Sequence, residues 1–238
     1  MITAIDFKTL GHANHGWLDT HHHFSFASYR DPARVHWGAL RVWNDDVIAA
    51  QTGFPRHGHA SMEIITYVMA GAITHRDSLG NEGRTEAGDV QVMSAGTGIE
   101  HEEWNRETVP THLFQIWIIP SRPGGTPRWD AAKFPKSDRA GELVVLASGR
   151  PIDEGKGALL IRQDAAILGA TLAPGQSVTH TLGLNRFAYV VPAQGTLTVN
   201  GTRIAERSAA AIAGEPAIEI TSEGGAEFVL ADVPPLPV

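Results

Sequence analysis

The sequence predicts an all-β protein made of two β-barrels joined by a linker, and three observations carry this prediction. Helical periodicity is scarce along the 238 residues, whereas short runs of Val, Ile, Thr, Tyr and Phe recur between breaks at Gly, Pro, Asn and Asp. A segment rich in Pro, Gly and charge divides the chain at residues 121–142. The second half also repeats the first weakly, since YVMAGAITHRDSLGN from Tyr67 is echoed by YVVPAQGTLTVNG from Tyr189.

These observations give the expected domain organisation. Residues 1–120 are expected to form a metal-binding N-terminal barrel, residues 121–142 a linker without strands, and residues 143–238 a degenerate C-terminal barrel without metal. The stretch before the second tyrosine repeat holds a single histidine, His180, and the later stretch AIEITSE holds none. The repeat therefore predicts two similar barrels and one metal site.

The strands expected in the first half are MEIITYVMAGAITHRD, DVQVMSAG and THLFQIWIIP, in which β-branched and aromatic residues dominate. Residues 78–83 between the first two are expected to form a hairpin loop, because Gly and Asn supply the positive φ that such turns need. Gly96 and Gly98 are expected to form the turn that leads into EHEEWN. After the linker, the β pattern resumes at Leu143.

Composition excludes several classes of protein. The 19 basic and 26 acidic residues give a net charge of −7 with no basic block, which argues against a direct nucleic-acid surface. No apolar run reaches the roughly 18 residues needed to cross a bilayer, and the N-terminus lacks the features of a signal peptide. The absence of cysteine excludes disulfides and thiolate sites. We therefore expect a cytoplasmic protein without membrane association, and a monomer.

Two short segments, about forty residues apart, carry paired candidates for metal ligands. His57 and His59 lie in FPRHGHASMEIITYV, and His101 and Glu103 lie in AGTGIEHEEWN. On an extended strand, a spacing of two residues puts both side chains on the same face. Two such strands facing each other across a barrel could close three imidazoles and one carboxylate around a single metal ion. Neutral imidazole with carboxylate oxygen suits Fe, Ni, Cu, Mn or Zn.

Three other polar residues near these segments need a separate interpretation. Strand alternation turns Glu102 away from the face of His101, which favours Glu103 as the ligand. Glu63 is expected to share the odd-numbered face of the histidine strand, either as a fifth ligand or as an acceptor that orients an imidazole. Gln115 faces either the metal cavity or solvent, because a buried glutamine needs a hydrogen-bond partner.

The remaining histidines and aromatic residues have simpler expected roles. The run at residues 21–23 is expected to make structural hydrogen bonds, with His22 pointing the opposite way from its two neighbours. No ligand spacing is found at His12, His15, His36, His75, His112 or His180. Packing in the core or between the domains is expected for Trp17, Phe24 and Phe26.

The two ligand segments resemble the two motifs of the cupin fold, although Ser94 stands where cupins often have proline. A more specific resemblance is to the pirin family. It rests on the segments HANHGWLD (12–19), HFSFASYRDP (23–32), LRVWNDDVI (40–48), the HxHxxMEIITYV pattern (57–68) and MSAGTGIEHEE (93–103). The resemblance extends over essentially the whole chain, which is most similar to the bacterial pirins with quercetin 2,3-dioxygenase activity.

This resemblance implies a bicupin with one divalent transition metal ion bound by His57, His59, His101 and Glu103. Fe(II) is the expected ion, and Ni, Cu, Mn, Co or Zn would also suit these donors. The resemblance further implies a metal-dependent dioxygenase that cleaves a flavonol such as quercetin with O2, releasing carbon monoxide and leaving a depside ester. Glu103 is the implied general base that takes the proton of the substrate.

Two alternatives remain open at the level of the sequence. Some pirins act as transcriptional co-regulators whose partner surface responds to the redox state of iron, and a charge of −7 permits a protein partner while arguing against direct DNA contact. The chain could instead be a cupin enzyme with another substrate, because nothing in the sequence specifies a pocket for a flavonoid.

Overall fold

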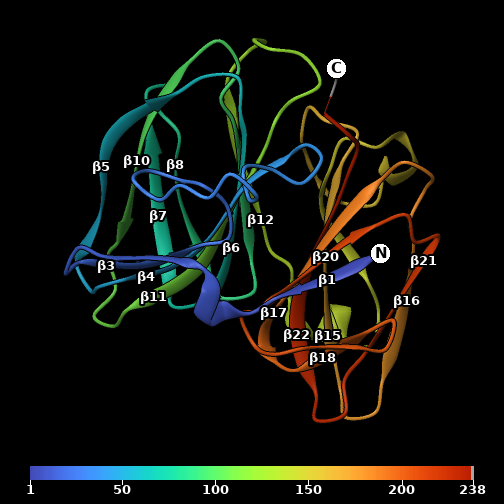
Figure 1. Ribbon diagram of the computed structural model, residues 1–238. Coiled ribbons are helices and arrows are strands. Elements are labelled where there is room, and N and C mark those ends of the chain that lie inside the picture. The colour runs from blue at the N-terminus through green and yellow to red at the C-terminus, as the bar shows by residue number, and fades with distance from the viewer. Residues whose placement is uncertain (237–238) are drawn as a thin grey trace.

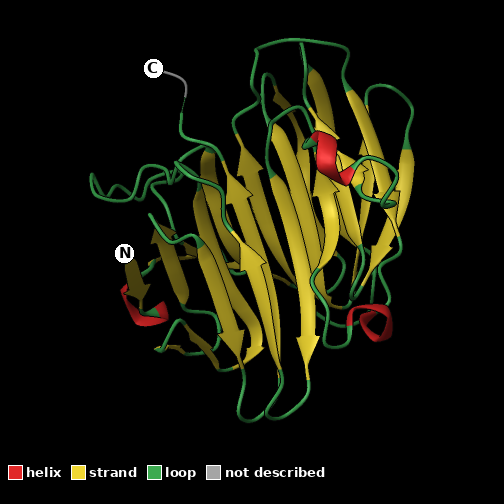
Figure 2. Cartoon of the chain, turned by 90° about the vertical axis from the view of Figure 1, so that its right-hand side faces the viewer, coloured by secondary structure: helices red, strands yellow, loops and turns green. Residues whose placement is uncertain are grey.

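Two β-barrels, each built from a seven-stranded and a four-stranded sheet, lie side by side in the computed structural model (Figures 1 and 2). The structure describes residues 1–236. The sheets of the first barrel have the strand orders β12-β9-β6-β11-β4-β3-β2 and β5-β10-β7-β8. Those of the second have the orders β1-β20-β17-β22-β15-β13-β14 and β16-β21-β18-β19. The all-β class and the two barrels predicted from the sequence are confirmed.

The first barrel has eleven strands within the described residues. They are β2 (Gly11–Asn14), β3 (Leu18–His22), β4 (Leu40–Ile48), β5 (Thr52–His59), β6 (Glu63–Ala70), β7 (Ala72–Asp77), β8 (Glu82–Glu86), β9 (Val90–Ser94), β10 (Ile99–Asn105), β11 (Thr111–Ile118) and β12 (Arg128–Ala132). Gly71, between β6 and β7, has a φ of +76° and lies against Thr111, whose Cα would be 3.0 Å from an added Cβ. This turn therefore requires glycine.

The second barrel also has eleven strands in residues 1–236. They are β1 (Ile2–Ile5), β13 (Val144–Ser148), β14 (Leu159–Leu160), β15 (Ala166–Leu172), β16 (Ser177–Thr181), β17 (Phe187–Gly195), β18 (Leu197–Val199), β19 (Thr202–Ile204), β20 (Ala209–Ala213), β21 (Ala217–Thr221) and β22 (Ala226–Val233). The helices in the same part of the chain are short 3-10 turns, namely η1 (Phe7–Thr9), η2 (Lys136–Arg139) and η3 (Pro151–Asp153). None of them is long and apolar enough to cross a membrane.

The two seven-stranded sheets pack face to face and form the main hydrophobic core between the barrels. Trp43, Tyr67 and Phe114 contribute from the first sheet, and Tyr189 and Val229 from the second, all with no exposed surface. Burial of a large apolar side chain stabilises a fold by about 1.5–3 kcal/mol. The barrels are therefore held together by an extensive apolar interface as well as by the chain that connects them.

The interiors of the two barrels differ in chemistry. The second barrel is filled by aliphatic and aromatic side chains such as Val199, Ile218, Ile220, Phe228 and Leu230, all fully buried. The first barrel has apolar clusters at its two ends, with a band of buried polar side chains between them. That band contains Thr66, His75, Gln91, His101, Glu103 and Gln115. In the first barrel, buried polar side chains thus surround the predicted ligands His101 and Glu103.

Strand pairing departs from the expected domain boundaries in two places. β1 precedes the first barrel in sequence but pairs with β20 of the second, and its blue ribbon lies among the strands of that barrel in Figure 1. β12 lies inside segment 121–142, where no strand was expected, and pairs with β9 of the first barrel. The sequence RWDAA is too short and too polar for periodicity to reveal this edge strand.

Candidate metal centre

The predicted ligands lie on two neighbouring strands of one sheet, not on strands that face each other across the barrel as expected. β5 and β10 pair antiparallel in the four-stranded sheet, with His101 directly opposite His57. Directly opposite residues in an antiparallel pair have Cβ atoms only about 4.5–5.5 Å apart, so the pairing itself brings the two imidazoles together. The register shifts between His101 and Glu103, and Glu103 lies opposite Phe54. Pro55 therefore falls at an irregularity of the strand pairing, where the missing N–H of proline is tolerated.

Three imidazoles gather at this point of the first barrel. The ring centroids of His57 lie 4.8 Å from His59 and 4.5 Å from His101, and one nitrogen of each ring lies within 4.8 Å of the others. Nδ1 of His57 donates to the carbonyl oxygen of Pro55 at 2.8 Å, which leaves its Nε2 free. Nε2 of His101 is buried and has no hydrogen-bond partner within residues 1–236. Two ring nitrogens are thus available as ligands.

Glu103 adjoins the imidazoles and is held by a network of amides. Alternation along β10 buries His101 and Glu103 and leaves Glu102 partly exposed, as the sequence predicts. Oε1 of Glu103 accepts a hydrogen bond from Nε2 of Gln91, and Oε2 accepts one from Nε2 of Gln115, each at 2.6 Å. One oxygen of Glu103 also lies within 4.8 Å of nitrogens of His101 and His75. The carboxylate is therefore fixed in position next to the histidine cluster.

His75 supports His101 from behind, a role that the sequence did not reveal. Nδ1 of His75 lies 3.4 Å from Nδ1 of His101, and its Nε2 lies 3.1 Å from Oδ2 of Asp77. The ring of Trp129 stacks on His75 at 4.8 Å. The chain from Asp77 through His75 to His101 fixes the orientation of the His101 ring with Nε2 toward the cluster. The signal in the sequence that could have revealed this role was the alternating pair His75 and Asp77 in the segment THRD.

The electrostatics of the cluster favour a metal ion. Burial and the neighbouring imidazoles lower the pKa of His101 to about 3 and that of His59 to about 4. Both rings are therefore neutral near pH 7, which is the form that donates a lone pair to a metal. A buried ring nitrogen without a partner costs about 1–3 kcal/mol, and a metal ion would remove that cost. Three imidazoles and a carboxylate fit a divalent transition metal ion.

Comparisons with known proteins agree with the fold. Residues 6–118 match the model of the pirin family, and residues 145–233 match that of the quercetinase C-terminal cupin domain. A pirin-like protein of Caulobacter vibrioides is 57% identical over 232 residues, which cover 98% of this chain and 99% of that protein. The chain belongs to the pirin family.

Two relatives from Escherichia coli extend the comparison for this pirin. The quercetin 2,3-dioxygenase of strain K12 is 42% identical over 227 residues, which cover 95% of this chain and 96% of that protein. The crystal structure of the bacterial pirin YhhW in complex with nickel(II) matches with a TM-score of 0.92 at 40% identity, over 99% of this chain and all of that one. The two cupin barrels are therefore those of a bacterial pirin.

Three of the four candidate ligands of this pirin face a cavity of about 570 Å³. His57, His59 and Glu103 line it. Its aromatic lining comes from Trp17, Phe26, Phe54 and Trp117, and its polar lining includes Thr20, His22, Asn44 and Asp46. The volume lies within the range of about 300–1,000 Å³ that is usual for small-molecule sites. Aromatic side chains and hydrogen-bonding groups together suit a planar, polyhydroxylated ligand.

Asp46 is a second residue of the cavity that the sequence did not single out. It is 2% exposed, and the hydroxyl of Thr20 donates to its Oδ1 at 2.5 Å. Burial, with smaller contributions from the charges of Asp45 and Glu103, raises the pKa of Asp46 to about 7. Its carboxyl group therefore carries a proton for a large part of the time at neutral pH and can donate a hydrogen bond into the cavity.

The expected position of Glu63 is wrong. The histidine strand ends at His59, the chain turns at Ser61 with a φ of +50°, and Glu63 begins β6 in the other sheet. There its Oε2 accepts a hydrogen bond from Ser94 at 2.6 Å. Because the turn breaks the alternation, Glu63 shares no face with the histidines.

Other expectations around the site have mixed outcomes. Phe24 is buried in the core between the barrels, as predicted. Trp17 packs against a smaller core cluster, also as predicted, and additionally lines the cavity, whereas Phe26 lines the cavity instead. The structural hydrogen bonds predicted for the histidine run are confirmed for His22, which donates to Asn44 at 2.9 Å, and for His23, which lies 3.0 Å from the Tyr189 hydroxyl. His22 also lines the cavity. Gln115, whose direction was open, faces the cavity.

Proposed function

We propose that His57, His59, His101 and Glu103 bind one divalent transition metal ion, with Fe(II) as the native ion. The gathering of three imidazoles beside a fixed carboxylate, at the wall of a cavity, carries this proposal. A related bacterial pirin is known in complex with nickel(II), which supports the binding of a divalent metal ion by this fold. Ni, Cu, Mn, Co and Zn are alternatives because selection among such ions depends on availability as much as on affinity.

We infer that the metal-loaded protein is a dioxygenase that cleaves a flavonol such as quercetin with O2. The bound metal would supply Lewis-acid and redox chemistry at the cavity wall. The aromatic side chains of Phe26 and Trp117 would pack on the rings of the substrate, and Asn44 and Asp46 would bind its hydroxyl groups. The sequence relation to a quercetin 2,3-dioxygenase supports this choice of substrate class.

Glu103 is the proposed catalytic residue and acts as general base. Its two oxygens accept hydrogen bonds from Gln91 and Gln115, which fix the carboxyl group in place at the wall of the cavity. A positioned carboxylate of this kind can take the proton from a substrate hydroxyl group. The Glu103→Gln variant keeps the shape of the side chain but removes the base, so turnover should fall or metal binding should weaken.

The test is dioxygen uptake with quercetin by protein loaded separately with Fe(II), Ni(II), Cu(II) or Mn(II). The expected result is uptake that depends on metal, disappears in His57→Ala and falls steeply in Glu103→Gln. His36→Ala, a substitution of an exposed histidine, is the matched control and should keep full activity. Absence of uptake with every stoichiometrically bound metal would overturn the quercetinase proposal, and full activity of Glu103→Gln would remove Glu103 from the mechanism.

A further inference from the structure

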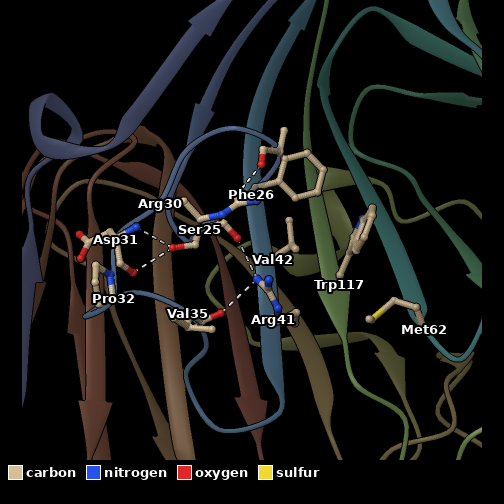
Figure 3. Close-up of a pocket in the computed structure, with 11 residues that line it drawn as sticks. Ser25, Phe26, Arg30, Asp31, Pro32, Val35, Arg41, Val42, Met62 and Trp117 are labelled. Carbon is tan, nitrogen blue, oxygen red and sulfur yellow. Dashed lines mark hydrogen bonds between the residues drawn. The ribbon is translucent and has the colours of Figure 1, made fainter.

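A second cavity of about 590 Å³ adjoins the candidate metal centre. It is formed mainly by the loop after β3, by the start of β4 and by Met62 (Figure 3). Phe26, Ala27 and Trp117 line both cavities and so form the partition between them. The ring of Trp117 meets that of Phe26 edge to face at 5.4 Å and that of His59 at 5.0 Å. The partition is therefore one aromatic layer thick.

The second cavity carries uncompensated positive charge in a protein of net charge −7. Arg30 and Arg41 both line it, and neither has a carboxylate oxygen within 4.0 Å among residues 1–236. The one acidic lining residue, Asp31, accepts a hydrogen bond from Nε of Arg34 at 2.8 Å, and its carboxylate points away from Arg41 in Figure 3. The charge of Asp31 is therefore neutralised by Arg34, a residue that does not line the cavity.

Arg41 is the better placed of the two arginines. Its Nη1 donates to the carbonyl oxygens of Ser25 at 2.9 Å and Val35 at 3.1 Å, which anchors the guanidinium beneath Val42 (Figure 3). Its Nε and Nη2 make no hydrogen bond within the described part of the chain, so they are available to a ligand. An anchored guanidinium presents a planar pair of donors that matches a carboxylate group.

Much of the remaining lining is apolar. Val42, which is 2% exposed, lies next to Arg41, and Phe26, Met62 and Trp117 line the side away from Asp31 (Figure 3). A cavity with anchored cationic donors on one side and aromatic and aliphatic groups on the other selects a ligand that is both anionic and flat. We propose that this cavity, here called the arginine pocket, binds an aromatic carboxylate.

The proposed function gives the arginine pocket a product to bind. Addition of O2 to a flavonol with loss of carbon monoxide leaves a depside, which is an aromatic ester with a free carboxyl group. That group is fully ionised at pH 7, because the pKa of a carboxylic acid is about 4, whereas the flavonol itself has no carboxylate. Only this step of the inference rests on the proposed function. The pocket would then draw the product across the Phe26 and Trp117 partition and clear the metal centre for the next substrate.

The experiment is calorimetric titration of metal-loaded protein with 4-hydroxybenzoate, and with 4-hydroxybenzamide as its neutral analogue. The anion should bind at least tenfold more tightly than the amide, and its affinity should fall as salt is added. Arg41→Gln should weaken binding of the anion at least tenfold, because it removes a charge-assisted pair of hydrogen bonds. Arg122→Gln, a substitution of an exposed arginine, is the matched control and should leave binding unchanged.

The His57→Ala variant distinguishes binding in the arginine pocket from binding at the metal. If 4-hydroxybenzoate binds in the arginine pocket, this variant should keep the affinity of the wild type. If its carboxylate binds at the metal, the variant should lose that affinity. Loss of binding in His57→Ala but not in Arg41→Gln, or no binding to the wild type at millimolar concentration, would overturn the inference. Because Arg41 also holds the loop carbonyls, Arg30→Gln is tested as well, with a loss of severalfold expected.

The titration requires no turnover, so it is independent of the proposed function. Binding that depends on Arg41 in a protein that consumes no O2 with quercetin would support the pocket and overturn the quercetinase proposal. Turnover of quercetin without such binding would support the quercetinase proposal and overturn the arginine pocket.

Discussion

Nε2 of Gln115 lies 2.6 Å from Oε2 of Glu103 and links the two sheets of the first barrel at the metal centre. Gln115 comes from β11 of the seven-stranded sheet, and Glu103 comes from β10 of the four-stranded one. The indole nitrogen of Trp117 in turn donates to Oε1 of Gln115 at 3.3 Å, which fixes the orientation of the amide. The carboxylate is thus positioned by a neighbour that touches no other candidate ligand.

Gln115→Leu should weaken metal binding by about tenfold to a hundredfold without removing a ligand, because groups that orient a metal ligand commonly contribute that much. The dissociation constant is measured by competition with a chelator. Gln194→Leu, at an exposed glutamine of the second barrel, should leave it unchanged. An unchanged affinity in Gln115→Leu would show that Gln91 alone holds Glu103.

Glu227 joins the barrels and the connecting segment through a buried ion-pair network. It accepts hydrogen bonds from the Tyr67 hydroxyl and from Nζ of Lys136 at 2.6 Å, and Nη2 of Arg139 lies 3.5 Å away. Arg139 is only 1% exposed. Glu227→Leu would leave the buried guanidinium without a counter-charge, and we expect it to lower the free energy of unfolding by about 3 kcal/mol. Urea denaturation measures this, with the exposed Glu223→Leu as control; equal stability of the two variants would contradict it.

The local features of the site were predictable because they depend on alternation within one strand. His101 and Glu103 share the inner face of β10, and Glu102 turns away, as the spacing indicates. Glu63 was misplaced because a single left-handed residue, Ser61, starts a new strand in the other sheet. The pattern of hydrophobic residues does not indicate where a single residue adopts a positive φ, so the break in alternation at Ser61 could not be predicted from it.

The long-range features were not predictable for a different reason. β1 pairs with β20, which lies about two hundred residues later, and the sequence ITAI contains nothing that specifies this partner. His75 approaches His101 only because β7 and β10 are neighbours in the sheet. Periodicity determines which face a residue occupies, but it does not determine which strands are adjacent.

His23 makes stability depend on pH in the acidic range. Complete burial lowers the pKa of His23 to about 3, whereas the unfolded chain binds the proton near pH 6.5. The unfolded state therefore binds more protons below pH 6.5, and stability falls as pH drops. Between pH 7 and pH 5.5 this histidine should contribute a loss of about 1 kcal/mol. His23→Gln should show a flatter dependence in urea denaturation over that range, and the exposed His36→Gln should show the slope of the wild type.

Asp46 produces the opposite dependence, between about pH 4 and pH 7. Its pKa of about 7 in the folded protein, raised mainly by burial, exceeds the usual value of 3.8, so the folded state holds a proton that the unfolded state has lost. Stability should therefore fall as pH rises from about 4 through 7, by about 2 kcal/mol between pH 5 and pH 8 in metal-free protein. Asp46→Asn cannot ionise, and its Oδ1 can still accept the hydrogen bond of the Thr20 hydroxyl. The stability of the variant relative to wild type should therefore increase across this interval.

Urea denaturation of the chelator-treated proteins at pH 5 and pH 8 measures this difference, with the exposed Asp138→Asn as control. If Asp46→Asn and wild type keep a constant difference in free energy of unfolding, the carboxyl group is ionised throughout and does not act as a donor. If the difference grows as expected, Asp46 holds its proton over much of this interval. It then complements Glu103 in the same cavity, because one carboxyl group donates to substrate oxygens while the other accepts a proton.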